Sequence, residues 1–310
     1  MPLLPLAGGA IIALVAATFA FPWLEFVLTL AIAKGLAALG VAILLRGGLI
    51  SIGHALFFAV GAYATAFAMR DFGITDVFAL ILISAIISLA AGLLIGVYVV
   101  RYRAIFFAML NLAISMVLFS LLAKFYGMTG GTDGLRVGTP TVLGMVLEAK
   151  GFATFLFYAS IAAMVLAGLA VNAYFKSPLG EALSAIHTNE IRLEYLGIPV
   201  RGVLLVAYGL SALLAGIGGT FAAMTIGHVL PDMAYWTDSG HLVLVAVLGG
   251  ISGIGGPFVG AVFLELVHTL AAGVTDAWNM IVGAALLGVI FFMPKGLIGF
   301  LRPAKKGDAA

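Results

Sequence analysis

The chain has 310 residues, of which 64% are hydrophobic and only 9% are charged. A soluble domain carries roughly 25% charged residues, so this chain has too little polar surface to face water on all sides. We therefore expect an integral membrane protein. The absence of cysteine excludes disulfides and thiolate metal sites. The net charge of +2, without a basic stripe, argues against nucleic-acid binding.

Ten apolar segments follow one another along the chain, and a spanning helix needs about 20 mostly apolar residues. We expect spans near 3–22, 26–45, 49–69, 77–99, 104–124, 152–174, 202–226, 239–251, 256–274 and 277–294. The first lacks a basic n-region, so we predict a span there rather than a signal peptide. A glycine-rich run ending in Pro257 must break the helix between the eighth and ninth spans.

The distribution of lysine and arginine orients these spans. Ten spans put both termini on one side, and cytoplasmic loops carry an excess of Lys and Arg. With the tail placed in the cytoplasm, ten basic residues fall in inside segments, four fall in outside loops, and Lys34 lies within a span. The pattern predicts an all-α polytopic protein with both termini cytoplasmic.

The inside segment 176–201 is too polar to span and too patterned to be a plain linker. Pro178 and Gly180 mark its entry, and Gly197 and Pro199 end it. Apolar residues at close to helical spacing between these limits predict two short helices with one apolar face on the membrane surface. This apolar face comprises Leu183, Ile186, Ile191 and Leu196.

Two interpretations of this segment stay open from the residues alone. It is either an interfacial connector or a docking helix for a cytoplasmic partner. As a docking helix it would present polar contacts from Glu181, His187, Glu190 and Arg192.

Polar residues within the third span form a candidate pathway site. Ser51 and His54 lie three apart, and Gly47, Gly48 and Gly53 bracket them, which favours a broken or re-entrant helix start. Transporters often place solute contacts at such breaks. The alternative is close helix packing, with His54 bonded to a neighbouring carbonyl.

Other polar residues inside spans have simpler interpretations. Asn111 and Ser115 lie four apart, and we expect hydrogen bonds between helices there. Glu265 and His268 are expected to pair with each other or with a nearby basic residue. Lys34 could neutralise Glu265 or extend outward.

The outside segment 125–151 is the longest on its side. Gly130, Gly131 and Gly134 predict turns, and Asp133 adds charge. It either helps to dock a binding protein or is a plain structured loop.

Five sets of residues, in order along the chain, resemble the branched-chain amino acid (Liv-type) permeases of ABC importers. They are LISIGHALFF at 49–58 with VGAY at 60–63, TGGTDGL at 129–135, GEAL, AI, NEI and LGI between 180 and 198, VLGG at 247–250 with GP and GA at 256–261, and PKGL at 294–297. The first two sets are similar to the M-type of the two permeases in such transporters. The set at 180–198 resembles the EAA-type coupling loop.

The resemblance implies a single transmembrane permease domain, 1–310, with a type II importer-like fold. It implies a cytoplasmic coupling loop at 176–201 between spans six and seven, and a periplasmic loop at 125–151. The ATPase-coupling residues would be Glu181, Ala182, Ile186, His187, Asn189, Glu190, Arg192 and Gly197. The pathway candidates are Ser51, Gly53, His54 and Asn111.

The resemblance also implies partners in a bacterial inner membrane: an H-type permease forming a heterodimer, two cytoplasmic ATPases that bind ATP-Mg, and a periplasmic solute-binding protein. A P-loop needs a Gly-Lys pair, and this chain contains none. We therefore expect a non-catalytic subunit without a cofactor of its own.

The expected solute is a branched-chain or other hydrophobic amino acid. Urea, amides and aromatic acids are alternatives within the same family. An ion-coupled secondary transporter is the alternative class, and it would need more paired charges within the spans than this chain shows.

Overall fold

The computed structural model describes residues 18, 21–250, 253–275, 277–293 and 296–301. These residues are almost entirely helical, which confirms the predicted all-α fold. The longer helices are α2 (Trp23–Arg46), α3 (Ala55–Phe72), α4 (Val77–Val99), α5 (Ala104–Lys124), α7 (Ala149–Phe175), α8 (Pro178–Tyr195), α9 (Val200–Ile226), α10 (Trp236–Gly249), α11 (Gly256–Ala272) and α12 (Trp278–Phe292). The short elements are α6 (Tyr126–Thr129), η1 (Gly131–Asp133), β1 (Leu135–Arg136), β2 (His228–Val229), η2 (Pro231–Ala234) and α13 (Gly296–Leu301).

Nine of the ten expected spans each coincide with one helix in the part of the chain that the structure describes. The remaining expected span, 3–22, lies almost wholly outside the described residues. Five helices, α2, α4, α5, α7 and α9, are long and apolar enough to cross a membrane, whereas α11 and α12 are shorter. The expected span 49–69 starts too early, because α3 begins only at Ala55. The broken helix start predicted there is confirmed.

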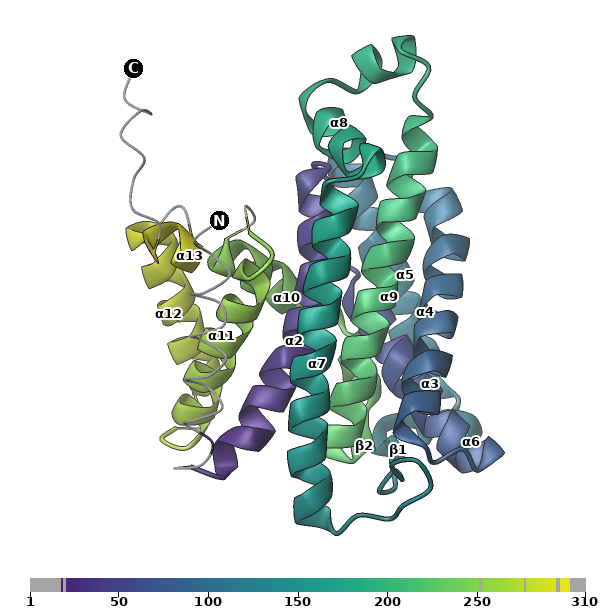
Figure 1. The fold of residues 1–310 in the computed structure, drawn as a ribbon, viewed down its shortest axis with the longest axis vertical. Helices are drawn as coiled ribbons and strands as arrows, with labels where there is room; N and C mark the ends of the chain where they lie inside the picture. The colour runs from purple at the N-terminus through teal and green to yellow at the C-terminus, as the bar shows by residue number, and fades with distance from the viewer. Residues whose placement is uncertain (1–17, 19–20, 251–252, 276, 294–295, 302–310) are drawn as a thin grey trace.

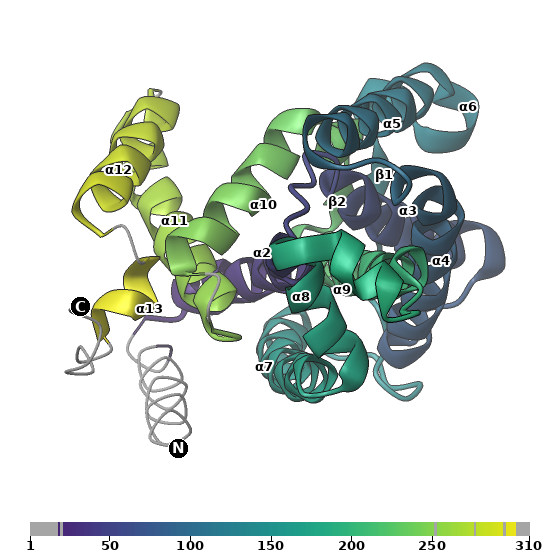
Figure 2. The same ribbon diagram turned by 90° about the horizontal axis from the view of Figure 1, so that it is seen from above.

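Two helices occupy the interior of the bundle. Of the 18 residues in the most apolar stretch of each helix, 89% are buried in α2 and 61% in α9, but only 22% in each of α4, α5 and α7. Figures 1 and 2 show α2 passing between the α7–α9 side and the group α10, α11, α12 and α13. The three peripheral helices therefore present broad apolar surfaces to lipid or to another subunit.

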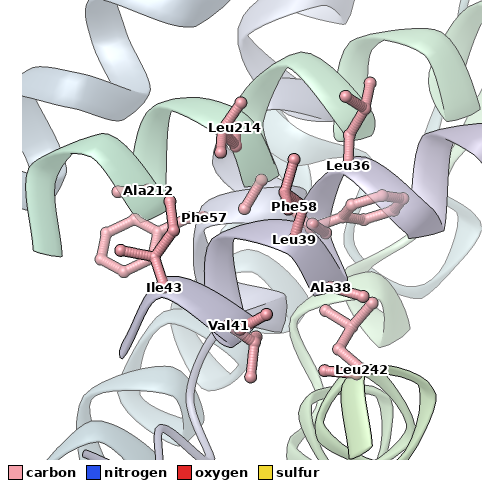
Figure 3. Close-up of a cluster of buried hydrophobic side chains, with 14 of the residues drawn as sticks. Leu36, Ala38, Leu39, Val41, Ile43, Phe57, Phe58, Ala212, Leu214 and Leu242 are labelled. Carbon is pink, nitrogen blue, oxygen red and sulfur yellow. The ribbon is translucent and has the colours of Figure 1, made fainter. Parts of the chain in front are cut away.

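Figure 3 shows how α2 fills this interior. Leu36, Leu39 and Ile43 are fully buried on α2 and belong to one cluster with Phe57 of α3 and Leu214 of α9. Most of α2 is apolar around its whole circumference, with Glu25 and Lys34 as charged exceptions before its last residue, and such a pattern is typical of a helix in the interior.

Helix α9 approaches its neighbours at positions without side chains. A Cβ at Gly219 would overlap the carbonyl oxygen of Phe58 on α3, and a Cβ at Gly61 would overlap that of Gly216. The Ser84 hydroxyl of α4 donates to the Gly216 carbonyl at 3.1 Å. Lipid tails are as apolar as leucine, so close packing and such hydrogen bonds take over from the hydrophobic effect between membrane helices.

The segment 125–151 is a structured loop fastened to the helix ends. Strand β1 pairs antiparallel with β2. The Tyr126 hydroxyl donates to Asp133 at 2.6 Å, and this hydrogen bond raises the pKa of Tyr126. His228 Nε2 lies 2.8 Å from the Asp133 carbonyl, and Arg70 donates to the Met128 carbonyl at 2.6 Å. The predicted glycine turns are present, with positive φ at 130, 131 and 134.

We predict that Gly219→Ala lowers the free energy of unfolding by about 1–3 kcal/mol, because the new methyl group overpacks the contact between α9 and α3. Thermal unfolding of the purified protein in detergent measures the effect. The control is Gly283→Ala on α12, where a Cβ would meet nothing within 4 Å. Equal stability of the two variants would contradict the role assigned to this contact.

Candidate functional site

Helix α8 lies within the predicted coupling loop and begins at a sharp turn from α7. Ser177 caps it, because its Oγ accepts a hydrogen bond from Gly180 N at 3.3 Å and donates to the Tyr174 carbonyl at 2.6 Å. Pro178 occupies the first helical turn, where its missing N–H costs nothing. A Cβ at Gly180 would overlap the Tyr174 carbonyl, so only glycine fits this turn.

The loop contains two short helices, as predicted. Asn189 has non-helical backbone angles, φ −161° and ψ 96°, and its Oδ1 accepts from Arg192 N at 3.0 Å. Asn189 therefore caps a second helix. Gly197, at φ +77°, ends that helix.

The first half of α8, 178–188, is seated on the turn that follows α2. Ala182, Leu183 and Ile186 are buried, and a Cβ at Gly47 would lie 2.7 Å from Leu183 Cδ1. A Cβ at Gly48 would lie 2.6 Å from Cδ2 of the exposed His187. Gly48 also has a φ of +74°, a backbone conformation that favours glycine.

The second half of α8 is tied to the connection between α4 and α5. Arg103 donates two hydrogen bonds to the Glu190 carboxylate, at 2.8 and 2.7 Å. Leu193 is buried beside this ion pair in the main core cluster. Glu190 is thus already paired within its own chain.

The predicted single apolar face of the loop is wrong. Leu183 and Ile186 face the bundle, but Ile191, Tyr195 and Leu196 are exposed, Tyr195 at 88%. The kink at Asn189 changes the direction of the helix and so separates the buried apolar residues from the exposed ones. Figure 1 shows this end of the loop beyond the ends of α7 and α9. We call Ile191, Tyr195 and Leu196 the apolar tip.

The segment 47–54, between α2 and α3, is non-helical, and most of it is buried, although Gly48 and Ile50 are exposed. His54 Nδ1 lies 3.0 Å from Ser51 Oγ, and both side chains are fully buried. Ser239 of α10 caps the start of α3 by accepting from Ala55 N at 2.9 Å. His54 Nε2 has no hydrogen-bond partner among the described residues, although the Ser211 backbone lies close by.

The four pathway candidates lie together. A Cβ at Gly53 would overlap the backbone of Asn111 on α5. The Tyr208 hydroxyl of α9 donates to Asn111 Oδ1, and Asn111 Nδ2 donates to the Phe107 carbonyl at 2.8 Å. The rings of His54 and Tyr208 meet edge to face at 6.3 Å between centroids. We call the segment 47–54 together with Asn111 and Tyr208 the junction.

Sequence reasoning missed Tyr208, although a tyrosine hydroxyl inside a glycine-rich span was a usable signal. A buried tyrosine hydroxyl needs a polar partner, and few were available at that depth. The hydrogen bonds expected of Asn111 and Ser115 between helices are confirmed, since Ser115 donates to the Ala234 carbonyl at 2.8 Å.

A pocket lies elsewhere in the described part of the chain. It has a volume of about 520 Å³, lies between α3, α4 and α5, and is lined almost wholly by hydrophobic side chains. The junction residues do not line it. Among the described residues, no group of three or more His, Cys, Asp or Glu side chains could hold a metal ion.

Inside the membrane region, the predicted pairing of Glu265 is confirmed. Lys34 Nζ lies 2.7 Å from Glu265 Oε2, and His268 Nδ1 lies 3.8 Å from Glu265 Oε1.

Comparisons with known proteins give the family. The family described as "Branched-chain amino acid transport system / permease component" matches residues 23–291. The high-affinity branched-chain amino acid transport system permease proteins LivM of Escherichia coli K12 and Salmonella typhimurium LT2 are each 26% identical over 280 residues. Each alignment covers 84% of this chain and 66% of LivM, so the chain spans slightly less than two thirds of these relatives.

A fructose import permease protein, FruF of Bifidobacterium longum, is 27% identical over 118 residues, which are 36% of this chain and 32% of FruF. No solved structure matches the chain. The similarity to LivM confirms the predicted Liv-type, M-type resemblance. Because the family match covers most of the chain, this protein belongs to the permease components of branched-chain amino acid transport systems, as a non-catalytic, multi-pass protein of the bacterial inner membrane.

Proposed function

We propose that this chain is the M-type transmembrane subunit of an ABC importer that takes up branched-chain or other hydrophobic amino acids. Its topology would have ten spans with both termini in the cytoplasm, in a single type II importer-like domain. An H-type permease would complete the pathway, and a periplasmic binding protein would deliver the solute at the side of loop 125–151. Two cytoplasmic ATPases would bind ATP-Mg. The family match and the likeness to LivM support this assignment.

The observation that carries the mechanism is that α8 is attached to both sides of the junction. Its first half sits on Gly47 and Gly48, which lead directly into Ser51 and His54. Its second half binds Arg103 through Glu190. Arg103 immediately precedes α5, the helix that carries Asn111. A displacement of α8 would move the two segments that meet at Gly53. The junction would thus transmit motion into the pathway walls.

The apolar tip would dock on an ATPase. Three large hydrophobic side chains exposed at a loop end are typical of a protein contact rather than of a free surface. Glu181, His187 and Arg192, which are exposed, would add polar contacts around it.

The remaining coupling residues would act within this chain. The buried side chains of Ala182 and Ile186 would keep α8 packed against the bundle. Through its hydrogen bonds, Glu190 would transmit a displacement of α8 to Arg103. Asn189 and Gly197 would shape the docking end, because they set the kink and the stop of the second helix.

The principal alternatives concern the solute and the energy source. An importer of urea, amides or aromatic acids would use the same α8 and junction. An ion-coupled secondary transporter would leave the exposed tip of α8 without a partner.

Uptake should depend on ATP hydrolysis by the partner subunits. In proteoliposomes containing both permeases, the ATPases and the binding protein, we expect radiolabelled L-leucine to accumulate only with ATP inside. Accumulation should stop with hydrolysis-deficient ATPases and should continue when ionophores dissipate ion gradients. Uptake that follows an ion gradient without ATP would favour the secondary transporter.

Replacing the apolar tip should release the ATPases. Ile191→Asp/Tyr195→Asp places two carboxylates in the proposed contact, and we expect ATPase affinity to fall by about tenfold or more, equivalent to ~1.4 kcal/mol. Co-purification and titration of the ATPases onto the detergent-solubilised permease pair measure this. The matched control is Val146→Asp, at an exposed apolar position at the opposite end of the bundle. Unchanged affinity in the tip variant would refute the docking role.

Breaking the Arg103–Glu190 pair should uncouple hydrolysis from transport. Its half-exposed side chains contribute only ~0–1 kcal/mol to stability, so Glu190→Gln should stay folded. We expect bound ATPases to hydrolyse ATP while leucine uptake per ATP falls. The exchange Arg103→Glu/Glu190→Arg should recover part of the uptake. Full coupling in Glu190→Gln would contradict the proposed path.

A further inference from the structure

An ion pair lies halfway along two membrane helices. Lys34 Nζ lies 2.7 Å from Glu265 Oε2. Lys34 is the twelfth of the 24 residues of α2, which puts it about 17 Å from either helix end. Glu265 lies near the middle of α11. Gly35 permits this approach of α2 to α11, because a Cβ there would come within 2.6 Å of Phe258.

Further ionisable groups surround this pair. His268 Nδ1 lies 3.8 Å from Glu265 Oε1, and the His268 ring meets Trp278 edge to face at 4.4 Å. Asp238 and His241 of α10 lie within electrostatic range of Lys34 or His268. We call Lys34, Asp238, His241, Glu265 and His268 the charged cluster. Three helices contribute to it, and it holds both a cation and carboxylates.

The cluster is open on one side. The Lys34 side chain is 40% exposed and that of His268 is 38% exposed, whereas Glu265 is buried. An ammonium group in the middle of a bilayer is too costly to face lipid tails. A surface of water or protein next to its exposed part avoids this cost, and a solute pathway between two permeases would provide such a surface.

The cluster also has unused binding capacity. An ammonium has three protons to donate, and Lys34 uses one of them among the described residues. The junction offers less, since Ser51 and His54 are fully buried behind Gly53 and Asn111. Of these two polar sites, only the charged cluster has side chains that a passing solute could reach without rearrangement of the bundle.

We propose that the charged cluster is a solute subsite that binds both charged groups of an α-amino acid. The Lys34 ammonium receives the solute carboxylate, and the carboxylates of Glu265 and Asp238 receive the solute ammonium. Lys34 and Glu265 hold each other between transport events, so that neither charge is left unpaired when the site is empty. This assignment rests on the proposed import function and narrows its solute class to zwitterions, which urea and amides are not.

The test uses the complete reconstituted transporter with radiolabelled L-leucine. The variant Lys34→Met/Glu265→Gln removes both charges together and leaves no unpaired ion. We expect initial uptake to fall by about tenfold or more, while ATPase stimulation by the loaded binding protein stays at the wild-type level. Lys34→Arg, which keeps the cation, should retain most of the uptake. Wild-type uptake in the double neutral variant would overturn the proposal.

A charge exchange separates solute binding from a merely structural ion pair. Lys34→Glu/Glu265→Lys keeps the pair but reverses its ends relative to Asp238, and we expect uptake to stay impaired. Full recovery would show that the pair only holds α2 to α11 and would overturn the subsite.

Asp238→Asn supplies a second test outside the ion pair. We expect the apparent KM for leucine to rise about fivefold or more with little change in the unfolding temperature, and an unchanged KM would refute this carboxylate's role. If the wild-type transporter shows no ATP-dependent leucine uptake, the import function itself fails, and that result is read independently of these variants.

Discussion

The backbone contact between α9 and its neighbours is the constraint on which the rest of the structure depends. Gly219 leaves room for the main chain of α3, and Gly216 leaves room for the Ser88 side chain of α4. The Ser84 hydroxyl donates to the Gly216 carbonyl at the same place. Lipid does not drive helices together as water does, so such close fits supply the attraction. They hold α3 and α9 in close backbone contact.

A rigid interior gives the non-helical segment 47–54 its importance. The helices on either side, α2 and α3, are packed along most of their length, but this connection is non-helical and its first residues make only turn hydrogen bonds to the end of α2. Helix α8 rests on its first residues and reaches α5 through Arg103. Under the proposed function, a displacement of α8 would reach this non-helical segment, which can change shape without breaking a helix. The charged cluster lies on the other side of α2, where α10 and α11 meet it.

Much of the coupling loop was predictable because its signals are local. Pro178 and Gly197 fix the limits of α8 through backbone geometry alone. The kink at Asn189 was not assigned to its residue, although asparagine is a strong helix cap and the hydrogen bond to Arg192 N is made within one turn. The partner of Glu190 could not be predicted from the sequence, because Arg103 lies 87 positions away.

The sequence by itself determined that this chain lies in a membrane, approximately where its long helices lie, and which family it resembles. These properties follow from composition, hydrophobic length and turn residues, and each depends on neighbouring positions. Only the tertiary structure decided that α2 and α9 are central while α4 and α7 are peripheral. In lipid an outward face is as apolar as an inward one, so hydrophobic periodicity does not distinguish them. For the same reason, only the fold showed that Ser51 and His54 are enclosed and that Lys34 is accessible.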